Sequence, residues 1–167
     1  FMSLPTDKID WEGHAVTLTW IRTDSPDKFS PITQVYGICF DQEDNILVCH
    51  KPGEAWHIPG QPWAVGESLE ETLRRELLEE VNAEIKNPQF LGVQRVDFPN
   101  NPNKEQGDVS YQARYICELD RLLSQKPDPD CGKVWVRELV PSARITEYVD
   151  WGTTGAAMFK NAIEARD

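Results

Sequence analysis

The stretch that decides the fold runs from residue 56 to residue 84 and reads WHIPGQPWAVGESLEETLRRELLEEVNAE. Its second half predicts an amphipathic helix over 69–81, because apolar residues recur there at every fourth position. Ser68, with Glu71 three residues later, forms a capping box at the start of this helix. Asn82 follows the last apolar position and tolerates the left-handed conformation that ends helices. We therefore expect a loop rich in proline and glycine that leads into a sharply bounded helix.

The predicted helix and the loop before it are strongly acidic. Between residues 66 and 84, seven glutamates stand against two arginines, so the segment carries five of the chain's 11 net negative charges. The glutamates are Glu67, Glu70, Glu71, Glu76, Glu79, Glu80 and Glu84. A solvated acidic helix face is the simplest interpretation of such a segment, and the spacing of the acids argues against it.

Three of these acids fall on one patch of the helix. A helical projection places Glu76 and Glu80 at the margin of the apolar arc, with Glu79 close by. Glu70 falls inside the arc as well, so it is the i, i+3, i+4 spacing that groups the three. Clustered carboxylates at the edge of a core repel one another and either take up protons or bind a cation. A site with only oxygen ligands suits Mg²⁺ or Mn²⁺ rather than zinc.

The spacing of this stretch resembles the signature of the Nudix hydrolase superfamily (MutT-like). That signature is a glycine, five residues, a glutamate, seven residues, and then Arg-Glu-aliphatic-any-Glu-Glu-any-Gly-aliphatic. Glu67 and the run 75–80 occupy the charged positions at the required spacing. Gln61 replaces the opening glycine, Asn82 the closing glycine and Ala83 the final aliphatic residue. Asparagine is the best substitute for a left-handed glycine, whereas a side chain at Gln61 could narrow the site, lower the rate or change the substrate.

The order of the elements predicts an α+β fold with a mixed sheet covered by helices. The expected strands are 14–21, 32–40, 46–50, 89–97, 109–119 and 133–139, followed by a closing helix over 153–165. The resemblance implies a Nudix-type α/β/α sandwich in which the loop and helix of the signature carry the metal site. We expect residues 31–167 to form the Nudix hydrolase domain. Residues 1–30 are an N-terminal extension with one strand, 14–21, whose unpaired edge could pair across a homodimer.

The resemblance also assigns roles to residues of the signature. It implies that Glu76, Glu79 and Glu80, with Gly60 beside them, form the metal site and hold Mg²⁺, or Mn²⁺, against a diphosphate. Glu76 and Glu79 are then catalytic as well. Arg75 joins them in the catalytic group, where it orients the glutamates by bidentate pairing rather than touching the substrate.

The general base remains open at this point. It is either a glutamate of the signature or an acid of a later loop. The loop candidates are Asp128, Asp130, Glu105 and Asp108. Glu67 is expected to support the loop or an outer metal ion.

The rest of the substrate must be bound outside the signature. Trp56 and Tyr111 could stack on a base, and Arg95 could reach a phosphate. Further candidates are Trp63 and Phe98 for stacking and Arg114 for phosphate. Each aromatic residue could equally belong to the core, and an arginine on an alternating strand could simply face solvent.

By resemblance, the function is Mg²⁺-dependent hydrolysis of the diphosphate linkage in a nucleoside diphosphate that is joined to another moiety. That compound could be a nucleoside triphosphate, ADP-ribose or another nucleotide sugar, or a dinucleoside polyphosphate. The alternative is a catalytically weakened Nudix fold that binds nucleotides or serves as an interaction module, for which Gln61 is the only indication. The three retained acids, which repel one another, favour the enzyme.

The overall charge limits the partners. With 17 Lys and Arg against 28 Asp and Glu, the chain lacks the basic surface that holds nucleic acid, and an anionic membrane would repel it. A small phosphate-bearing nucleotide, with a divalent metal supplying positive charge, is the expected ligand. No apolar run reaches 18 residues, and the first ten residues show no secretory signal. The four cysteines form no CxxC pair, which favours free thiols and a cytoplasmic location.

Overall fold

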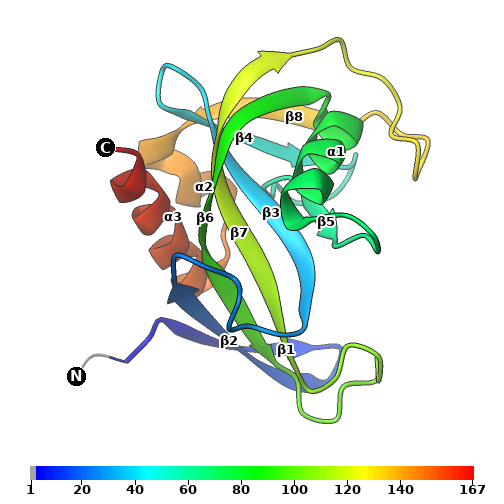
Figure 1. Cartoon of the computed structure of the whole chain (residues 1–167), viewed down its shortest axis with the longest axis vertical. Coiled ribbons are helices and arrows are strands. Elements are labelled where there is room, and N and C mark those ends of the chain that lie inside the picture. The colour runs from blue at the N-terminus through cyan, green and yellow to red at the C-terminus, as the bar shows by residue number, and fades with distance from the viewer. Residues whose placement is uncertain (1–2) are drawn as a thin grey trace.

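A single mixed sheet lies between two helices in the computed structural model, which describes residues 3–167 (Figure 1). One face of the sheet is covered by α1 (Leu69–Val81) and the other by α3 (Gly152–Arg166). This arrangement is the predicted α/β/α sandwich. No helix in this described part of the chain is long and apolar enough to cross a membrane.

The sheet has eight strands in the order β1-β2-β6-β7-β3-β4-β8, with β5 paired to β3 beside this path. The strands are β1 (Thr6–Trp11), β2 (His14–Arg22), β3 (Ile32–Phe40), β4 (Asn45–His50), β5 (Gly60–Pro62), β6 (Ala83–Asp97), β7 (Val109–Leu122) and β8 (Val136–Pro141). β3 and β7 run parallel, and the other pairs are antiparallel. Because β5 pairs with the middle of β3, the chain just before α1 is fixed to the centre of the sheet.

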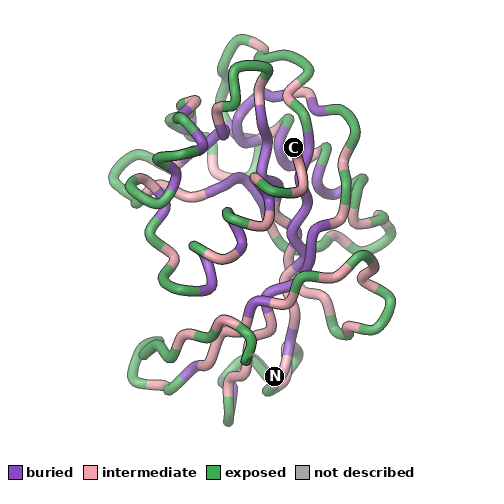
Figure 2. The backbone as a smooth tube through the Cα atoms, turned by 90° about the vertical axis from the view of Figure 1, so that its left-hand side faces the viewer, coloured by how far each residue is buried: buried purple, intermediate pink, exposed green. Residues whose placement is uncertain are grey.

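The core has one cluster on each face of the sheet, and buried segments run along the central strands (Figure 2). On one face, Leu73 and Leu77 of α1 pack against Val35 of β3. On the other face, Met158 and Phe159 of α3 belong to the same cluster as Ile38 of β3. Alternate residues of β3 therefore face opposite helices, as the two-residue period of a strand requires.

The predicted ends of α1 are confirmed. The Ser68 hydroxyl accepts a hydrogen bond from the Glu71 backbone N–H at 3.1 Å, and the Ser68 N–H donates to the Glu71 carboxylate at 3.2 Å. Asn82 has φ 53° and ψ 45°, the left-handed conformation expected after the last turn. Both ends have determinants close by in the sequence, and the pattern was therefore sufficient to place them, although Lys126 and Arg137 also hydrogen-bond to the C-terminal end.

Other elements differ in length from the prediction. β6 begins at Ala83, directly after the turn at Asn82, and β7 continues to Leu122. β8 begins at Val136 because residues just before it belong to a loop with its own hydrogen bonds. Two short helices, η1 (Ser142–Arg144) and α2 (Ile145–Tyr148), were not expected. The total number of elements is therefore larger than the sequence pattern indicated.

The N-terminal extension contains two strands, not the one that was predicted for residues 1–30. β1 and β2 form a hairpin, and β2 also pairs with β6. The predicted strand 14–21 is therefore paired on both sides, and the expectation that it offers a free edge was wrong. The edge strand is β1; residues 1 and 2 lie outside the described residues. A homodimer stays a prediction.

Asp7 of β1 ties this hairpin to the start of α3. Its carboxylate accepts hydrogen bonds from the backbone N–H groups of Thr153 and Thr154, at 3.0 and 2.8 Å, and from the Thr154 hydroxyl at 2.8 Å. Burial alone would raise the pKa of Asp7, but the hydrogen bonds from Thr154 and Thr153 hold it below its usual value. Asp7 thus caps the N-terminus of α3, although the two are far apart in the sequence.

Replacing Asp7 with alanine should lower the free energy of unfolding by about 1 kcal/mol at neutral pH, the usual effect of losing a helix cap. Because the folded-state pKa is depressed, this contribution exists above the unfolded pKa and disappears as the pH falls through the folded value. Urea unfolding at about pH 7 and about pH 2 measures both effects, with Lys8→Ala on the same strand as control. A difference that persists in acid would contradict the assignment.

Candidate active site

The loop before α1 passes very close to β3 at Gly60. A Cβ atom at this position would lie 2.3 Å from the Val35 carbonyl oxygen and 2.4 Å from Cδ1 of Tyr36, so only glycine permits the pairing of β5 with β3. Gln61, one residue later, is not among the residues with a positive φ. Gly60 therefore meets the need for close approach in this loop, and the side chain of Gln61 causes no strain of the left-handed kind.

The substitution Gly60→Ala should destabilise the protein by more than about 2 kcal/mol, because the added methyl group meets backbone that cannot move aside. Gln61→Ala, at the next position of β5, is the matched control and should cost about 1 kcal/mol or less. Thermal and urea unfolding of the two variants decide the matter. Equal stability of both would show that the loop can shift away from β3.

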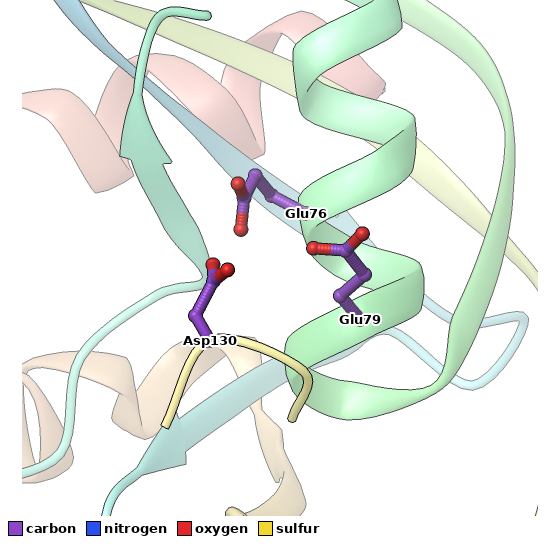
Figure 3. Close-up of side chains that lie close together, drawn as sticks. All are labelled: Glu76, Glu79 and Asp130. Atoms are coloured by element: carbon purple, nitrogen blue, oxygen red, sulfur yellow. The ribbon is translucent and has the colours of Figure 1, made fainter. Parts of the chain in front are cut away.

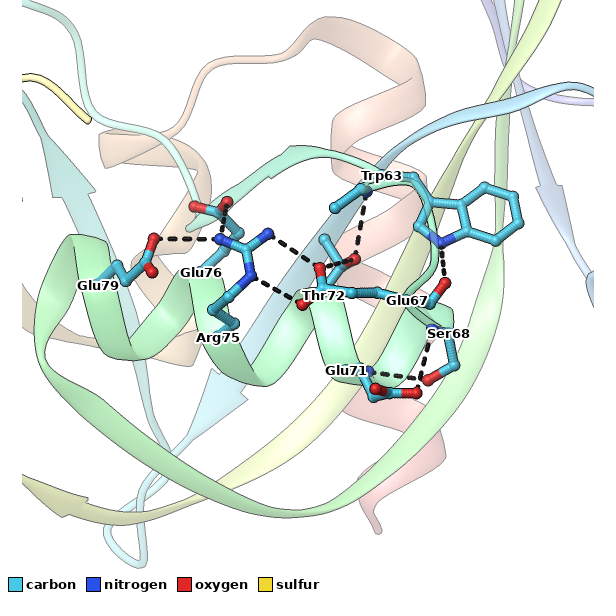
Figure 4. Close-up of polar contacts among 9 residues, drawn as sticks. Trp63, Glu67, Ser68, Glu71, Thr72, Arg75, Glu76 and Glu79 are labelled. Carbon is cyan, nitrogen blue, oxygen red and sulfur yellow. Dashed lines mark hydrogen bonds and ion pairs between the residues drawn. The ribbon is translucent and has the colours of Figure 1, made fainter. Parts of the chain in front are cut away.

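Arg75 joins the loop to the acids of α1 (Figure 4). Its Nε and Nη2 donate to the two carboxylate oxygens of Glu67, at 2.9 and 3.0 Å. Its Nη1 donates to Glu76 at 2.9 Å and to Glu79 at 3.1 Å. Glu67 also accepts a hydrogen bond from the Thr72 hydroxyl at 2.8 Å. Arg75 thus contacts both the loop and the acids of α1; that it orients the glutamates and that Glu67 supports the loop stay predictions.

The loop has a further brace at Trp63. Its indole Nε1 donates to the Glu67 carbonyl oxygen at 2.8 Å (Figure 4). The Ala64 backbone N–H donates to the Thr72 hydroxyl at 3.3 Å. Trp63 was a candidate for stacking on a base, and the structure shows its polar atom engaged inside the loop.

Three carboxylates converge beside α1. Glu76, Glu79 and Asp130 each offer an oxygen, and these oxygens lie within 4.8 Å of one another (Figure 3). Asp130 belongs to the loop between β7 and β8. Of the four loop acids considered as general base, it is the one in this cluster. Glu105 and Asp108 lie in the loop between β6 and β7, at the opposite end of the molecule from α1 (Figure 1).

Asp128 holds Asp130 in place. One of its carboxylate oxygens accepts a hydrogen bond from the Asp130 backbone N–H at 2.9 Å, and the other accepts from Nε1 of Trp135 at 2.8 Å. Its backbone oxygen accepts from the Gly132 N–H at 2.7 Å. Asp128 is buried, so its carboxylate organises the loop and Asp130 is the acid that the loop presents.

Glu76 and Glu80 are buried acids with unsatisfied oxygens. They are 4% and 1% exposed, and among residues 3–167 no hydrogen bond of normal geometry reaches Glu76 Oε2 or either oxygen of Glu80, although the side chain of Gln61 lies near Glu80 and opposes the rise of its pKa. Burial raises the pKa of Glu80 to about 9, and it also raises the pKa of Glu76 against the effect of Arg75. Buried carboxylate oxygens without partners are costly. A bound divalent cation would relieve this cost, so the residues fit such an ion. Glu80 lies outside the group of three close oxygens, and its role as a ligand remains a prediction.

Two of the three predicted substrate-binding residues, Arg95 and Tyr111, lie away from the acidic cluster. Trp56 is half-buried and packs edge-on against His50, with ring centroids 4.4 Å apart. Arg95 forms two hydrogen bonds with Asp97, and its cross-strand neighbour is Tyr111, near the start of β7. That end of β7 lies away from α1 (Figure 1). The structure does not bring Arg95 or Tyr111 to the acidic cluster.

The close approach of Gly60 to β3, the capped helix α1 and the convergent acids Glu76, Glu79 and Asp130 all occur on one α/β/α sandwich. The family model for the NUDIX domain matches residues 31–146. The chain therefore belongs to the Nudix family, as the signature indicated. The hairpin β1–β2 and the helix α3 lie outside the matched residues.

Comparison with individual proteins agrees with this family. The NAD-capped RNA hydrolase NudC of Mannheimia succiniciproducens is 32% identical over 72 residues, which are 40% of this chain and 27% of NudC. This chain thus matches only about a quarter of the length of that relative. The pyrophosphohydrolase BsRppH of Bacillus subtilis has a similar structure, with a TM-score of 0.68, 19% identity and coverage of 95% of this chain and 97% of that chain. The NUDIX domain of Shewanella oneidensis NrtR, solved with ADP ribose, gives a TM-score of 0.56 at 17% identity, covering 86% of this chain and 94% of that chain.

Proposed function

We propose that this chain is a divalent-metal-dependent hydrolase that cleaves the diphosphate linkage in a nucleoside diphosphate joined to another moiety. The main support is the set of buried carboxylate oxygens of Glu76 and Glu80 that have no partner, next to Glu79 and Asp130. Oxygen donors at this density suit Mg²⁺ best, with Mn²⁺ as a substitute. The whole chain's net charge of −11 also means that a phosphate-bearing substrate needs a bound cation.

The residues of the site would have different roles in this reaction. When bound, the cation would neutralise phosphate oxygens and lower the pKa of a water molecule. Arg75 fixes the carboxylates of Glu76 and Glu79, and Glu67 fixes Arg75 from the other side. Asp130 is the exposed acid of the cluster, so it can hold the cation or take a proton from water.

The proposed substrate class is supported by chemistry that two similar proteins share. The name of NudC refers to NAD-capped RNA, and the NUDIX domain of NrtR was solved with ADP ribose; NAD and ADP-ribose each contain a nucleoside diphosphate. A nucleoside triphosphate, a nucleotide sugar and a dinucleoside polyphosphate contain the same unit. All of them therefore belong in the first panel of substrates.

The test is release of phosphate and nucleotide from this panel, with and without Mg²⁺ or Mn²⁺. We expect metal-dependent turnover of at least one compound, lost in Glu79→Gln and kept in Glu70→Gln. Glu70 is an exposed acid on the same helix and is the matched control. Nucleotide binding without turnover of any compound would contradict the proposal and favour the catalytically weakened binding module.

We also infer a reducing, cytoplasmic environment for this protein. All four cysteines are free, and Cys39, Cys49 and Cys117 are buried. Free thiols of this kind are typical of reducing compartments.

A further inference from the structure

A hollow lies on the face of the sheet that α3 covers, which is the face opposite α1. Two adjoining cavities of about 560 and 490 Å³ share their central lining. The shared residues are Ile9, Trp11, Leu18, Gln34, Gln94 and Gln112. This size is within the usual range for small-molecule sites. The hairpin β1–β2 contributes three of these residues, so the wall of the cavity is built by a segment outside the matched family region.

Three glutamines form one row across the floor of this cavity. Gln94 of β6 is the register partner of Gln112 of β7, which in turn is the register partner of Gln34 of β3. Side chains at paired positions point to the same face of a sheet. The side-chain oxygen Oε1 of Gln34 accepts a hydrogen bond from the Tyr36 hydroxyl at 2.8 Å. Oε1 of Gln112 accepts a hydrogen bond from Nη2 of Arg114 at 2.9 Å. These bonds use oxygens only, and no hydrogen bond within residues 3–167 uses the three amide nitrogens, so they can donate to a ligand.

The buried guanidinium of Arg114 lies next to this row of glutamines. Arg114 is 2% exposed and lines the larger cavity, and no carboxylate in the described chain forms a salt bridge with it. Its guanidinium lies over the ring of Tyr36 at 4.5 Å and near Trp151 at 5.6 Å, and its Nε has no partner. Burial lowers the pKa of Arg114 to about 10, so it remains protonated at neutral pH. Asp7 and Asp150 line the same cavity, but neither forms a salt bridge with Arg114, and the carboxylate of Asp7 is taken up by Thr153 and Thr154. A buried charge without a paired counter-charge favours an anionic ligand.

The two ends of the cavity differ in their neighbours. Tyr36, next to Arg114, is the register partner of Gly60 in the loop that leads to α1. The Arg114 end therefore lies next to β5, which begins the loop that leads to α1. The far end is lined by His14 and Phe98, whose rings lie 5.5 Å apart, and no Lys or Arg side chain lines it. A nucleotide can thus place its phosphates at the Arg114 end and its base toward the far end.

We propose that this cavity binds the nucleoside 5′-phosphate part of the substrate, with a phosphate oxygen on Arg114 and the base against Gln34, Gln94 and Gln112 beside Trp11. This inference rests on the proposed function for its orientation. The uncharged amide row suits the edge of a nucleobase, which offers both donors and acceptors. The exposed indole of Trp11 offers a surface for stacking. In this arrangement the N-terminal hairpin determines which nucleotides are accepted.

The test measures binding to the metal-free protein in EDTA, by calorimetry and tryptophan fluorescence. The probes are AMP, GMP, CMP, UMP, ribose 5-phosphate and inorganic phosphate. We expect at least one of the four nucleotides to bind at least tenfold more tightly than ribose 5-phosphate. Gln94→Ala and Arg114→Lys should each weaken that binding at least tenfold. Gln89→Ala, at an exposed position of the same strand outside this cavity, should leave it unchanged.

Several outcomes would overturn the inference. They are equal binding of ribose 5-phosphate and all four nucleotides, or unaltered binding by a folded Gln94→Ala variant. Should Arg114→Lys fail to fold, Gln94→Ala alone decides. Glu79→Gln should lose turnover and still bind the nucleotide. If the protein turns over substrate but the cavity variants do not alter nucleotide binding, this inference alone is refuted. If nucleotides bind without any turnover, the hydrolase proposal alone is refuted.

Discussion

Glu76→Gln should lower kcat/KM by a factor on the order of 10³ and, at the same time, stabilise the metal-free protein. A divalent ion contributes several kcal/mol to a phosphoryl reaction, and about 1.4 kcal/mol corresponds to a factor of ten. The amide keeps an oxygen that Arg75 can reach but weakens the hold on a cation. Without metal, the same change removes a buried charge whose Oε2 has no partner, so the free energy of unfolding should rise by about 1 kcal/mol.

The opposite signs of these two effects separate a functional acid from a structural one. A structural glutamate would lose activity and stability together when it is replaced. The measurements are steady-state kinetics with Mg²⁺ and thermal unfolding in EDTA. Glu70→Gln, at an exposed position of the same helix, is the control and should change neither quantity appreciably. A destabilised Glu76→Gln variant would show that the buried carboxylate serves the fold.

Features of the fold were predictable where they depend on residues close together in the sequence. Both ends of α1 were predictable because Ser68, Glu71 and Asn82 act within a single turn. β1 was missed because its sequence, TDKIDW, is mostly polar and its residues are largely exposed. Its position depends on β2 and on the contact of Asp7 with α3, which no local pattern reveals.

The same reasoning applies to the active site. The signature identified the acids of α1 by their spacing, but the carboxylate that completes the cluster comes from a loop about 50 residues later. Four loop acids were equal candidates in the sequence. The hydrogen bonds of Asp128 with Trp135 and with the Asp130 backbone then distinguish the organiser of the loop from the acid it presents.

The cavity on the α3 face of the sheet could be predicted from the sequence even less than the acidic cluster. Arg114 was one of two arginines considered for binding phosphate, and the three glutamines matched no motif. They form a row only because β6, β7 and β3 pair in one particular register. Register between distant strands is a property of the whole sheet, so a single sequence does not disclose which polar side chains share a face.

Arg75→Lys should lower kcat/KM by about 10- to 100-fold, the usual effect of disturbing a group that holds metal ligands. The guanidinium binds Glu67 through Nε and Nη2, and it reaches Glu76 and Glu79 through Nη1. A lysine ammonium is a single point charge on a flexible stem and cannot hold both sides in one geometry. The glutamates would then lose their fixed orientation although the net charge is unchanged.

A positioning role predicts more than loss of rate. Arg75→Lys should also weaken Mn²⁺ binding about tenfold, measured by calorimetry, whereas a purely structural arginine would leave cation affinity in the folded variant unaltered. Arg74→Lys is the matched control: this neighbouring arginine is exposed and donates to the Ile85 carbonyl oxygen rather than to an acid of the site. If Arg75→Lys binds Mn²⁺ and turns over substrate as the control does, the acids hold their positions without the guanidinium. The orienting role of Arg75 would then have to be abandoned, and the buried packing of Glu76 and Glu80 against the sheet would be sufficient to shape the site.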